Sequence, residues 1–294
     1  MKVLTLNTHS WFEEKQLEKI KQTAQIIIEK DYDAIALQEV NQKRNQTPSY
    51  HSKFIDIANG NEIPLKEDNY ALLLIKELEV MGYHYYWTWT ACHTDGYTRS
   101  YDEGLAILSK EPFSAFDGVV SKVNDYENYH RRKVLGINIP SWQTTICSVH
   151  FSWWESKDTH HKWEIPITQR YPFKTEWNNT IKLLSHSPFK RKIIMGDFNN
   201  PADHTGEGYD YIFKTYPKLK DVFSLANIKD GQFSIDSNID GWSENTKGKR
   251  IDLILASELD EVTSYSVLFD GRFTPLVSDH YGIESEFTFT SVNI

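Results

Sequence analysis

The stretch KIIMGDFN, residues 192–199, decides how this sequence is interpreted. Its apolar run predicts a buried strand over Lys192–Met195. In extended chain, residues i and i+2 share a face, so Asp197 and Asn199 point together while the phenylalanine between them points back to the core. Gly196 permits an unusual backbone or a close approach. A carboxylate beside a carboxamide offers oxygen ligands suited to a hard cation or to holding a water.

Polar residues stand at the ends of other apolar runs in the same way. They are Asn7 after the first run, Gln38-Glu39 after the second, His150 after a later one, Asp252 at the start of another, and Ser278-Asp279-His280 before the last. Loops beyond the strand ends of α/β sheets converge on one crevice. An asparagine after a strand commonly caps a turn, and a single histidine there is commonly structural. A single polar residue at a strand end therefore indicates little, and the prediction of a functional site rests on the whole set of them.

The apolar runs also predict the architecture. The chain opens with a β-α-β unit, in which an amphipathic helix joins two strands. The helices are predicted at Glu13–Lys30, Asn69–Met81 and Thr175–Ser185. The strands are predicted at Lys2–Leu6, Asp33–Gln38, Tyr83–Thr90, Gly104–Ser109, Val134–Ile139, Thr144–Phe151, Lys192–Met195, Ile251–Ala256, Val262–Leu268 and Gly282–Thr290. Many strands with few helices predict two packed sheets with helices outside. With no repeat and no Gly/Ser linker, we expect one domain over residues 1–294.

Composition excludes several classes of protein. The 294 residues are 39% hydrophobic and 25% charged, which is typical of a globular protein and not of a disordered tail, a fibre or a disulfide-stapled mini-domain. The longest apolar run, Tyr70–Ile75, falls far short of the ~18 residues that a membrane helix needs. We find no export signal, and the two cysteines are too few for a disulfide framework. We therefore expect a cytoplasmic protein without membrane partners.

Net charge argues against a polyanionic partner. The chain carries 32 basic and 41 acidic residues, a formal charge of −9. Duplex nucleic acid normally binds a basic stripe, and the densest basic cluster here is Arg131-Arg132-Lys133. Since a bound metal can supply local positive charge, this disfavours nucleic acid without excluding it.

Taken together, these segments resemble the endonuclease/exonuclease/phosphatase superfamily of metal-dependent phosphoesterases, which includes DNase I-like nucleases and bacterial sphingomyelinases. The matching motifs, in the family's order, are TLN ending at Asn7, LQE at Glu39, SVH at His150, GDFN at Asn199, RID at Asp252 and SDH at His280. The resemblance covers nearly the whole chain. It implies an α/β (α+β) DNase I-like fold of four layers, a sandwich of two packed mixed β-sheets flanked by helices.

The resemblance also implies a metal site. Glu39 would hold a divalent cation, expected to be Mg²⁺ with Mn²⁺ as a substitute, because Mg²⁺ binds through one or two carboxylates plus substrate phosphate. Asn7 and Asp279 would complete or flank that site. Asp197 and Asn199 would orient the attacking water and the phosphate oxygens. The implied reaction is in-line attack of water on phosphorus.

Two histidines would serve this reaction. The resemblance makes His280 a general base or phosphate contact, oriented by Asp252, since a carboxylate fixes the tautomer and raises basicity. His150 would face it across the phosphate, with Glu103 as its acidic partner. Tyr101 shares the face of Glu103 if the segment is extended, so it is either a phosphate contact or a packed aromatic.

The motifs leave the substrate open, because the family handles DNA, phospholipids, inositol phosphates and small phosphomonoesters. Trp153 and Trp154 directly follow the His150 motif. They are core aromatics, part of a lipid-binding loop, or stacking platforms for a ring-shaped ligand. Because they alternate faces in extended chain, we expect at least one to be exposed.

A phosphorylated sugar fits best. Tryptophan faces suit apolar sugar faces, so we predict substrate contacts from Trp153 and Trp154. The cations expected to suffice for one phosphate are Arg99, Arg131, Arg170, Lys249 and Arg250. The stretches LTLNTHSW, YDEGLAILS, GDFNNPA with GEGYD, and IDGW are similar to a branch from Gram-positive bacteria that includes maltose 6′-phosphate phosphatases. The resemblance thus implies a phosphatase that releases maltose and phosphate. The alternatives are a DNase I-like endonuclease, a sphingomyelinase-like phosphodiesterase, and a catalytically silent regulatory or carbohydrate-binding protein on the same fold.

Overall fold

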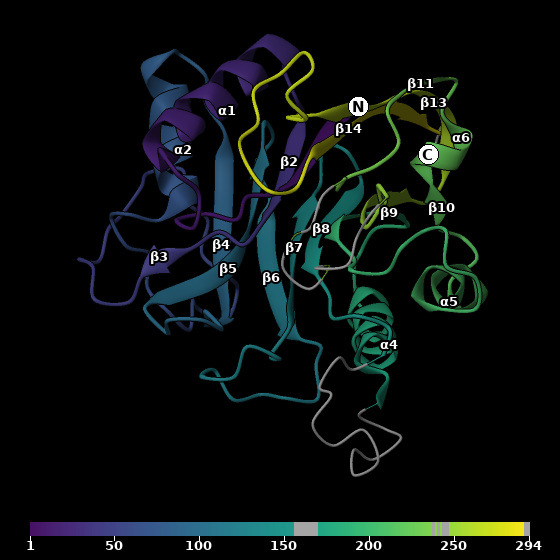
Figure 1. The fold of residues 1–294 in the computed structure, drawn as a ribbon, viewed down its shortest axis with the longest axis horizontal. Coiled ribbons are helices and arrows are strands. Elements are labelled where there is room, and N and C mark those ends of the chain that lie inside the picture. The colour runs from purple at the N-terminus through teal and green to yellow at the C-terminus, as the bar shows by residue number, and fades with distance from the viewer. Residues whose placement is uncertain (156–169, 237–238, 240–241, 243–246, 291–294) are drawn as a thin grey trace.

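Two β-sheets pack face to face, and helices cover their outer faces (Figure 1). The computed structural model describes residues 1–155, 170–236, 239, 242 and 247–290, so of the IDGW stretch only Ile239 and Trp242 are included. This arrangement confirms the predicted four-layer sandwich of mixed sheets. No helix in these ranges is both long enough and apolar enough to span a bilayer.

The first sheet has eight strands. They are β1 (Lys2–Asn7), β2 (Ala34–Gln38), β3 (Gln42–Lys43), β4 (Tyr86–Thr94), β5 (Tyr101–Ser109), β11 (Ile228–Asp230), β13 (Leu259–Leu268) and β14 (Gly282–Phe289). The order is β11-β13-β14-β1-β2-β5-β3, with β4 also paired to β5. Its outer face carries α1 (Gln16–Lys30) and α2 (Tyr70–Val80), seen together in Figure 1.

The second sheet has six strands. They are β6 (Ser114–Val119), β7 (Lys133–Ile139), β8 (Thr144–His150), β9 (Arg191–Asp197), β10 (Lys220–Asp221) and β12 (Asp252–Ala256), in the order β10-β12-β9-β8-β7-β6. On its outer face lie α4 (Pro172–Leu184) and α5 (Gly208–Thr215), and the short α6 (Val222–Leu225) follows β10.

The sequences of the strands are continuous apolar runs because both faces of each strand are buried. In β1, Val3 belongs to the core between the sheets, whereas Leu4 belongs to the core under α1 and α2. In β9, Ile193 faces the other sheet and Ile194 faces α4. Each run thus fills two cores, and its polar residues fall at the strand ends.

Two parallel strand pairs bring those ends together. In β1 and β2, Asn7 pairs in register with Gln38, and in β8 and β9, His150 pairs with Asp197. The antiparallel strand β12 places Asp252 opposite Asp197. The functional motifs of both sheets therefore end at one edge of the sandwich, as the carboxyl ends of parallel strands do in α/β folds.

Gly196 makes the close packing of β8 and β9 possible. Its φ is 146°, and a Cβ there would lie 2.0 Å from the carbonyl oxygen of Val149. An added side-chain atom would collide with backbone, which cannot move without breaking the strand pair.

Several predicted boundaries were displaced. The helix predicted from Glu13 begins at Gln16, because Lys15 has a left-handed backbone (φ 53°) and the preceding residues form a loop at the site. The strand predicted at Tyr83–Thr90 runs instead over Tyr86–Thr94. The elements missed by the sequence pattern are β3, β6, β10, β11, α5 and α6. They are short or interrupted by polar residues, so periodicity does not reveal them.

Candidate active site

The loops after β1 and β2 hold Asn7 and Glu39 against each other. Asn7 Nδ2 donates a hydrogen bond of 2.8 Å to Glu39 Oε1. The Glu39 backbone has a left-handed φ of 50°, and its carbonyl oxygen accepts hydrogen bonds from the hydroxyls of Thr8 (2.9 Å) and Ser10 (2.6 Å). These bonds offset the unfavourable backbone and fix where the Glu39 carboxylate points.

Asp197 lies at the centre of the site. Its Oδ2 is 3.3 Å from Asn7 Nδ2, 3.5 Å from His150 Nε2 and 3.8 Å from His280 Nε2. Its Oδ1 accepts a hydrogen bond of 2.8 Å from the backbone N–H of Asn199, and Asn199 Nδ2 lies 3.3 Å from Oδ2. The carboxylate–carboxamide pair predicted from GDFN therefore exists, and it faces both histidines.

His280 is held by a buried carboxylate. Its Nδ1 lies 2.9 Å from Asp252 Oδ2, so the ring presents Nε2 to Asp197. Burial alone would lower the pKa of His280, but Asp252 and then Asp197 raise it well above the usual value. Asp252 thus lies beside His280, as predicted, and its other oxygen, Oδ1, has no hydrogen-bond partner among the described residues.

His150 has the opposite surroundings. Its Nδ1 lies 3.7 Å from Glu103 Oε1, too far for a hydrogen bond, and its Nε2 lies 3.9 Å from Glu39 Oε1. Burial, followed by the positive charge of Arg132, lowers the pKa of His150 well below its usual value. We call His150, Asp197, Asp252 and His280 the buried cluster.

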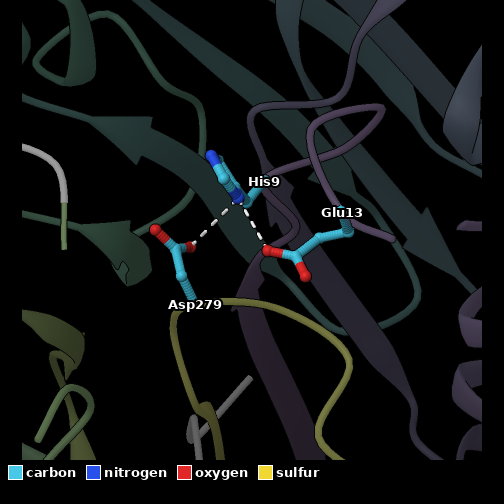
Figure 2. Close-up of side chains that lie close together, drawn as sticks. All are labelled: His9, Glu13 and Asp279. Atoms are coloured by element: carbon cyan, nitrogen blue, oxygen red, sulfur yellow. Dashed lines mark hydrogen bonds and ion pairs between the residues drawn. The ribbon is translucent and has the colours of Figure 1, made fainter. Parts of the chain in front are cut away.

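A second group of side chains borders the site. His9 Nδ1 lies 2.7 Å from Glu13 Oε1 and 3.7 Å from Asp279 Oδ1, and its other ring nitrogen points away from both carboxylates (Figure 2). Burial acts against the charge, but Glu13, Asp279 and Glu39 raise the pKa of His9 to about 9. Glu13 also accepts a hydrogen bond from Lys19 Nζ. The network is therefore close to charge balance.

One cavity of about 370 Å³ collects most of the predicted residues. Those lining it are Glu39, Glu103, His150, Trp153, Asp197, Asn199, Asp279 and His280. Asn7 and Asp252 are buried and contact this set through Glu39 and His280.

Other predicted residues lie outside this lining, among them the expected cations Lys249 and Arg250, of which Arg250 pairs with Asp221 at 2.7 Å. Tyr101 packs edge to face on Phe12, with ring centroids 5.5 Å apart. Trp154 packs among aromatic rings near α4 and α5, including those of Tyr171 and Tyr211. Arg99 is exposed on the loop before β5. Arg170 is exposed and pairs with Glu155 at 2.7 Å.

The cavity also contains residues that the motifs did not single out. They are His9, His93, Gly96, Tyr97, Tyr129 and Arg132. His9 stands two residues after Asn7, but β1 ends at Asn7 and His9 has a left-handed backbone (φ 41°), so the alternation of strand faces does not reveal it. Of the basic cluster, the sequence favoured Arg131, but Arg131 pairs with Glu62 at 2.7 Å, and Arg132 faces the cavity instead.

Arg132 is held by a buried histidine. His93 Nδ1 lies 2.8 Å from the carbonyl oxygen of Thr94, so Nδ1 carries the proton and Nε2 accepts a hydrogen bond from Arg132 Nη1 at 3.3 Å. Burial, followed by the charge of Arg132, lowers the pKa of His93 to about 3. Within the part of the chain that the structure describes, the buried Nε of Arg132 has no hydrogen-bond partner.

The carboxylates fit a hard divalent cation. Burial, then neighbouring carboxylates, raises the pKa of Glu39 to about 7, and burial, then Asp252, raises that of Asp197 to about 8. Burial raises the pKa of Glu103 to about 7. Gathering buried carboxylates is costly without a cation, and oxygen donors are what Mg²⁺ or Mn²⁺ prefers. The residues present thus suit such an ion.

Comparison with known proteins places the chain in a family. Residues 16–280 match the Endonuclease/Exonuclease/phosphatase family, and the chain belongs to it. Members of this family are hydrolases of phosphoesters, phosphatases and nucleases among them, and are generally dependent on a divalent metal. No curated protein matches the chain.

Solved structures with the same fold include three informative ones. A family protein from Leptotrichia buccalis is 29% identical, with a TM-score of 0.78 over 98% of this chain and 100% of that chain. A mannosyl-6-phosphatase from Bacteroides thetaiotaomicron is 15% identical, with a TM-score of 0.63 over 98% and 100%. A 3′ phosphatase from Neisseria, bound to a product DNA hairpin, is 19% identical, with a TM-score of 0.61 over 98% and 100%. The last two share the fold with this chain.

Proposed function

We propose that this protein is a Mg²⁺-dependent phosphomonoesterase that removes one phosphate from a small phosphorylated carbohydrate. The observation that carries the proposal is Arg132, the sole arginine or lysine among the described residues that line the cavity. Its buried Nε has no hydrogen-bond partner in residues 1–155, 170–236, 239, 242 and 247–290. One guanidinium beside several carboxylates suits a single phosphate group, whereas a polyanion needs several cations.

The side chains supply most of the chemistry. Glu39 and Asp279, with Asn7 beside Glu39, would hold the ion, which would neutralise charge on the phosphoryl oxygens. Asp197 accepts hydrogen bonds at the point where both histidines converge, so it orients the attacking water. Burial lowers the pKa of His280 and Asp252 raises it, and on balance the pKa is raised. His280 is therefore protonated and would donate a proton, in place of the general-base role that the resemblance implied.

His150 differs because its pKa is lowered, so this ring is neutral and able to accept a proton. Arg132 would neutralise a phosphate oxygen, and Asn199 would contact another through its carboxamide. Attack of water breaks the P–O bond to the sugar, and the leaving oxygen takes up a proton.

Maltose 6′-phosphate is our preferred substrate, because four stretches of the chain are similar to a branch of the family that includes phosphatases acting on it. The cavity of about 370 Å³ lies at the small end of the ~300–1,000 Å³ typical of ligand sites. It therefore has room for a phosphate together with part of a sugar.

The experiment is a phosphate-release assay on maltose 6′-phosphate, mannose 6-phosphate, plasmid DNA and sphingomyelin, with Mg²⁺, with Mn²⁺ and with excess EDTA. We expect release from a sugar phosphate with either ion and none in EDTA. Nicking of plasmid at a comparable rate would overturn the substrate, release in EDTA would overturn the metal, and inactivity on every compound would favour a silent binding protein.

The proposed role of Arg132 in phosphate binding can be tested by comparing it with the adjacent Arg131. Arg132→Lys keeps the charge but loses the planar fork, so KM for the sugar phosphate should rise about tenfold. Arg131→Lys is the matched control, since Arg131 pairs with Glu62 outside the cavity. Equal KM values for the two variants would refute the role of Arg132.

A further inference from the structure

The loop between β4 and β5 is fixed by one buried carboxylate. Asp95 is 1% exposed. Its Oδ1 accepts hydrogen bonds from the backbone N–H groups of Tyr97 (3.0 Å) and Thr98 (2.6 Å), and its Oδ2 accepts from those of Ser100 (2.7 Å) and Tyr101 (2.9 Å). Four backbone donors on one side chain hold this exposed loop in a single conformation.

This fixed loop presents an aromatic ring to solvent. Tyr97 is 68% exposed and lines the cavity. Phe12, from the loop after β1, packs edge to face against it, with centroids 5.9 Å apart. The ring is therefore supported from the protein side while most of its surface faces water.

Two more aromatic side chains line the same cavity. Tyr129, from the loop between β6 and β7, is 44% exposed and lies against Gly96, where a Cβ would come 3.3 Å from Tyr129 Cγ. Trp153 follows the catalytic strand β8 and is half-buried. We call Tyr97, Tyr129 and Trp153 the aromatic rim.

We propose that the aromatic rim is the leaving-group subsite, in which the tyrosines Tyr97 and Tyr129 stack on an uncharged sugar ring and so set substrate preference. This inference rests on the proposed phosphatase function and extends it to residues that no sequence motif marks. The rim lies in the same cavity as the buried cluster, so a molecule whose phosphate reaches His150 and Arg132 has its remaining atoms beside these rings.

The chemistry of the rim selects the occupant. Tyrosine rings offer apolar faces for sugar C–H groups and a hydroxyl for sugar hydroxyls. The nearby carboxylates of Glu103 and Asp279 disfavour a second anionic group. Because Asp95 orders the loop beforehand, binding does not have to order it, which increases affinity. A pyranose carrying one phosphate meets all of these conditions.

The test compares cyclic and acyclic leaving groups. For Tyr97→Ala, KM for maltose 6′-phosphate should rise about tenfold, whereas kcat/KM for glycerol 3-phosphate should fall by less than about twofold. Tyr97→Phe, which keeps the ring, should restore most of the lost affinity. Tyr50→Ala removes a ring that is 81% exposed and outside this cavity, so it controls for loss of a surface tyrosine.

The outcomes separate the two proposals. A wild-type enzyme that releases no phosphate from sugar phosphates overturns the proposed function, and the sugar subsite with it. An active wild type whose Tyr97→Ala and Tyr129→Ala variants lose efficiency equally on both substrates overturns the subsite alone. A selective loss on nucleoside monophosphates instead of sugar phosphates would also overturn it.

Discussion

The buried cluster and the aromatic rim occupy one cavity but are built in opposite ways. The side chains of Asp197 and Asp252 are 2% and 1% exposed, and each contacts other cluster residues. Tyr97 is 68% exposed, and it stands on a loop whose backbone is held by Asp95 while Phe12 packs against one side of its ring. The residues of the buried cluster contact one another, whereas the tyrosines of the aromatic rim expose much of their surface, where a ligand can contact them. Changes in the cluster should therefore affect every substrate, and changes in the rim should separate substrates.

The largest effect should come from Asp197→Asn. Both histidines approach its Oδ2, so activity on sugar phosphates and on small phosphoesters should fall together by about 10³-fold or more. The melting temperature should stay level or rise, because a buried carboxylate is replaced by a neutral group of the same shape. Activity assays and calorimetry on the same samples test both parts. A substantial drop in melting temperature would show that Asp197 serves packing.

The next largest effect on turnover should come from the carboxylate partner of His280, compared with the carboxylate near His150. Asp252→Asn removes the carboxylate 2.9 Å from His280, so turnover should fall by roughly 10²–10³-fold. Asp252 raises the pKa of His280, so its loss should lower that pKa and move the alkaline limb of the pH–rate profile to lower pH.

Glu103→Gln provides the matched comparison, since Glu103 lies 3.7 Å from His150 without a hydrogen bond. Its effect on turnover should be about tenfold or less. Identical pH–rate profiles for the two variants would contradict the unequal roles of these carboxylates.

Metal and pH should act together on stability. Burial raises the pKa of Glu39 from 4.5 to about 7 and that of Asp197 from 3.8 to about 8. A raised carboxyl pKa means that the folded state binds protons more tightly, so the contribution of these two groups to stability is greatest at low pH and is lost as pH rises from about 4 to 8. In EDTA, the melting temperature should fall across this window. Mg²⁺ should restore several degrees at pH 8 and little at pH 5.

Glu39→Gln should flatten this dependence, because it removes one buried charge and one ligand. A Mg²⁺-induced shift of equal size at pH 5 and pH 8 would argue against a carboxylate metal site.

The smallest effect concerns two adjacent tryptophans. Trp153 lines the cavity, so Trp153→Ala should raise KM for a disaccharide phosphate several-fold with little change for glycerol 3-phosphate. Trp154 packs among aromatic rings, so Trp154→Ala should lower the melting temperature and leave the ratio of the two kcat/KM values near that of wild type. The reverse pattern would assign the ligand contact to Trp154.

The sequence predicted the buried cluster better than the rim for a physical reason. His150, Asp197 and Asp252 sit at strand ends, and strand pairing fixes their separation once the fold is known. His280 lies two residues before β14 and is held beside them by Asp252. The Asp252–His280 pair was predicted and lies at 2.9 Å. Tyr97 and Tyr129, in contrast, lie on loops whose paths depend on contacts such as those of Asp95, and periodicity carries no information about these.

Arg132 illustrates the same limit. Arg131 and Arg132 are adjacent and chemically equal in the sequence, and both are buried in the structure. They differ in their partners, since Arg131 pairs with Glu62 whereas Arg132 lines the cavity. Because those partners are distant in the sequence, this choice could not be made from it. Trp153 and Trp154 were expected to face opposite ways, and the structure does separate them, since Trp153 lines the cavity whereas Trp154 packs against the core under α4 and α5. The expectation that at least one of them is exposed was wrong, because both are half-buried by these contacts.

The contact at Gly196 also limits how the enzyme can diverge. Any larger residue there would force apart the strands that carry His150 and Asp197. Substitutions of Gly196 should therefore be eliminated by selection. New specificities must then arise on the loops around Tyr97 and Tyr129, which a mutagenesis library can vary while leaving the strand pair untouched.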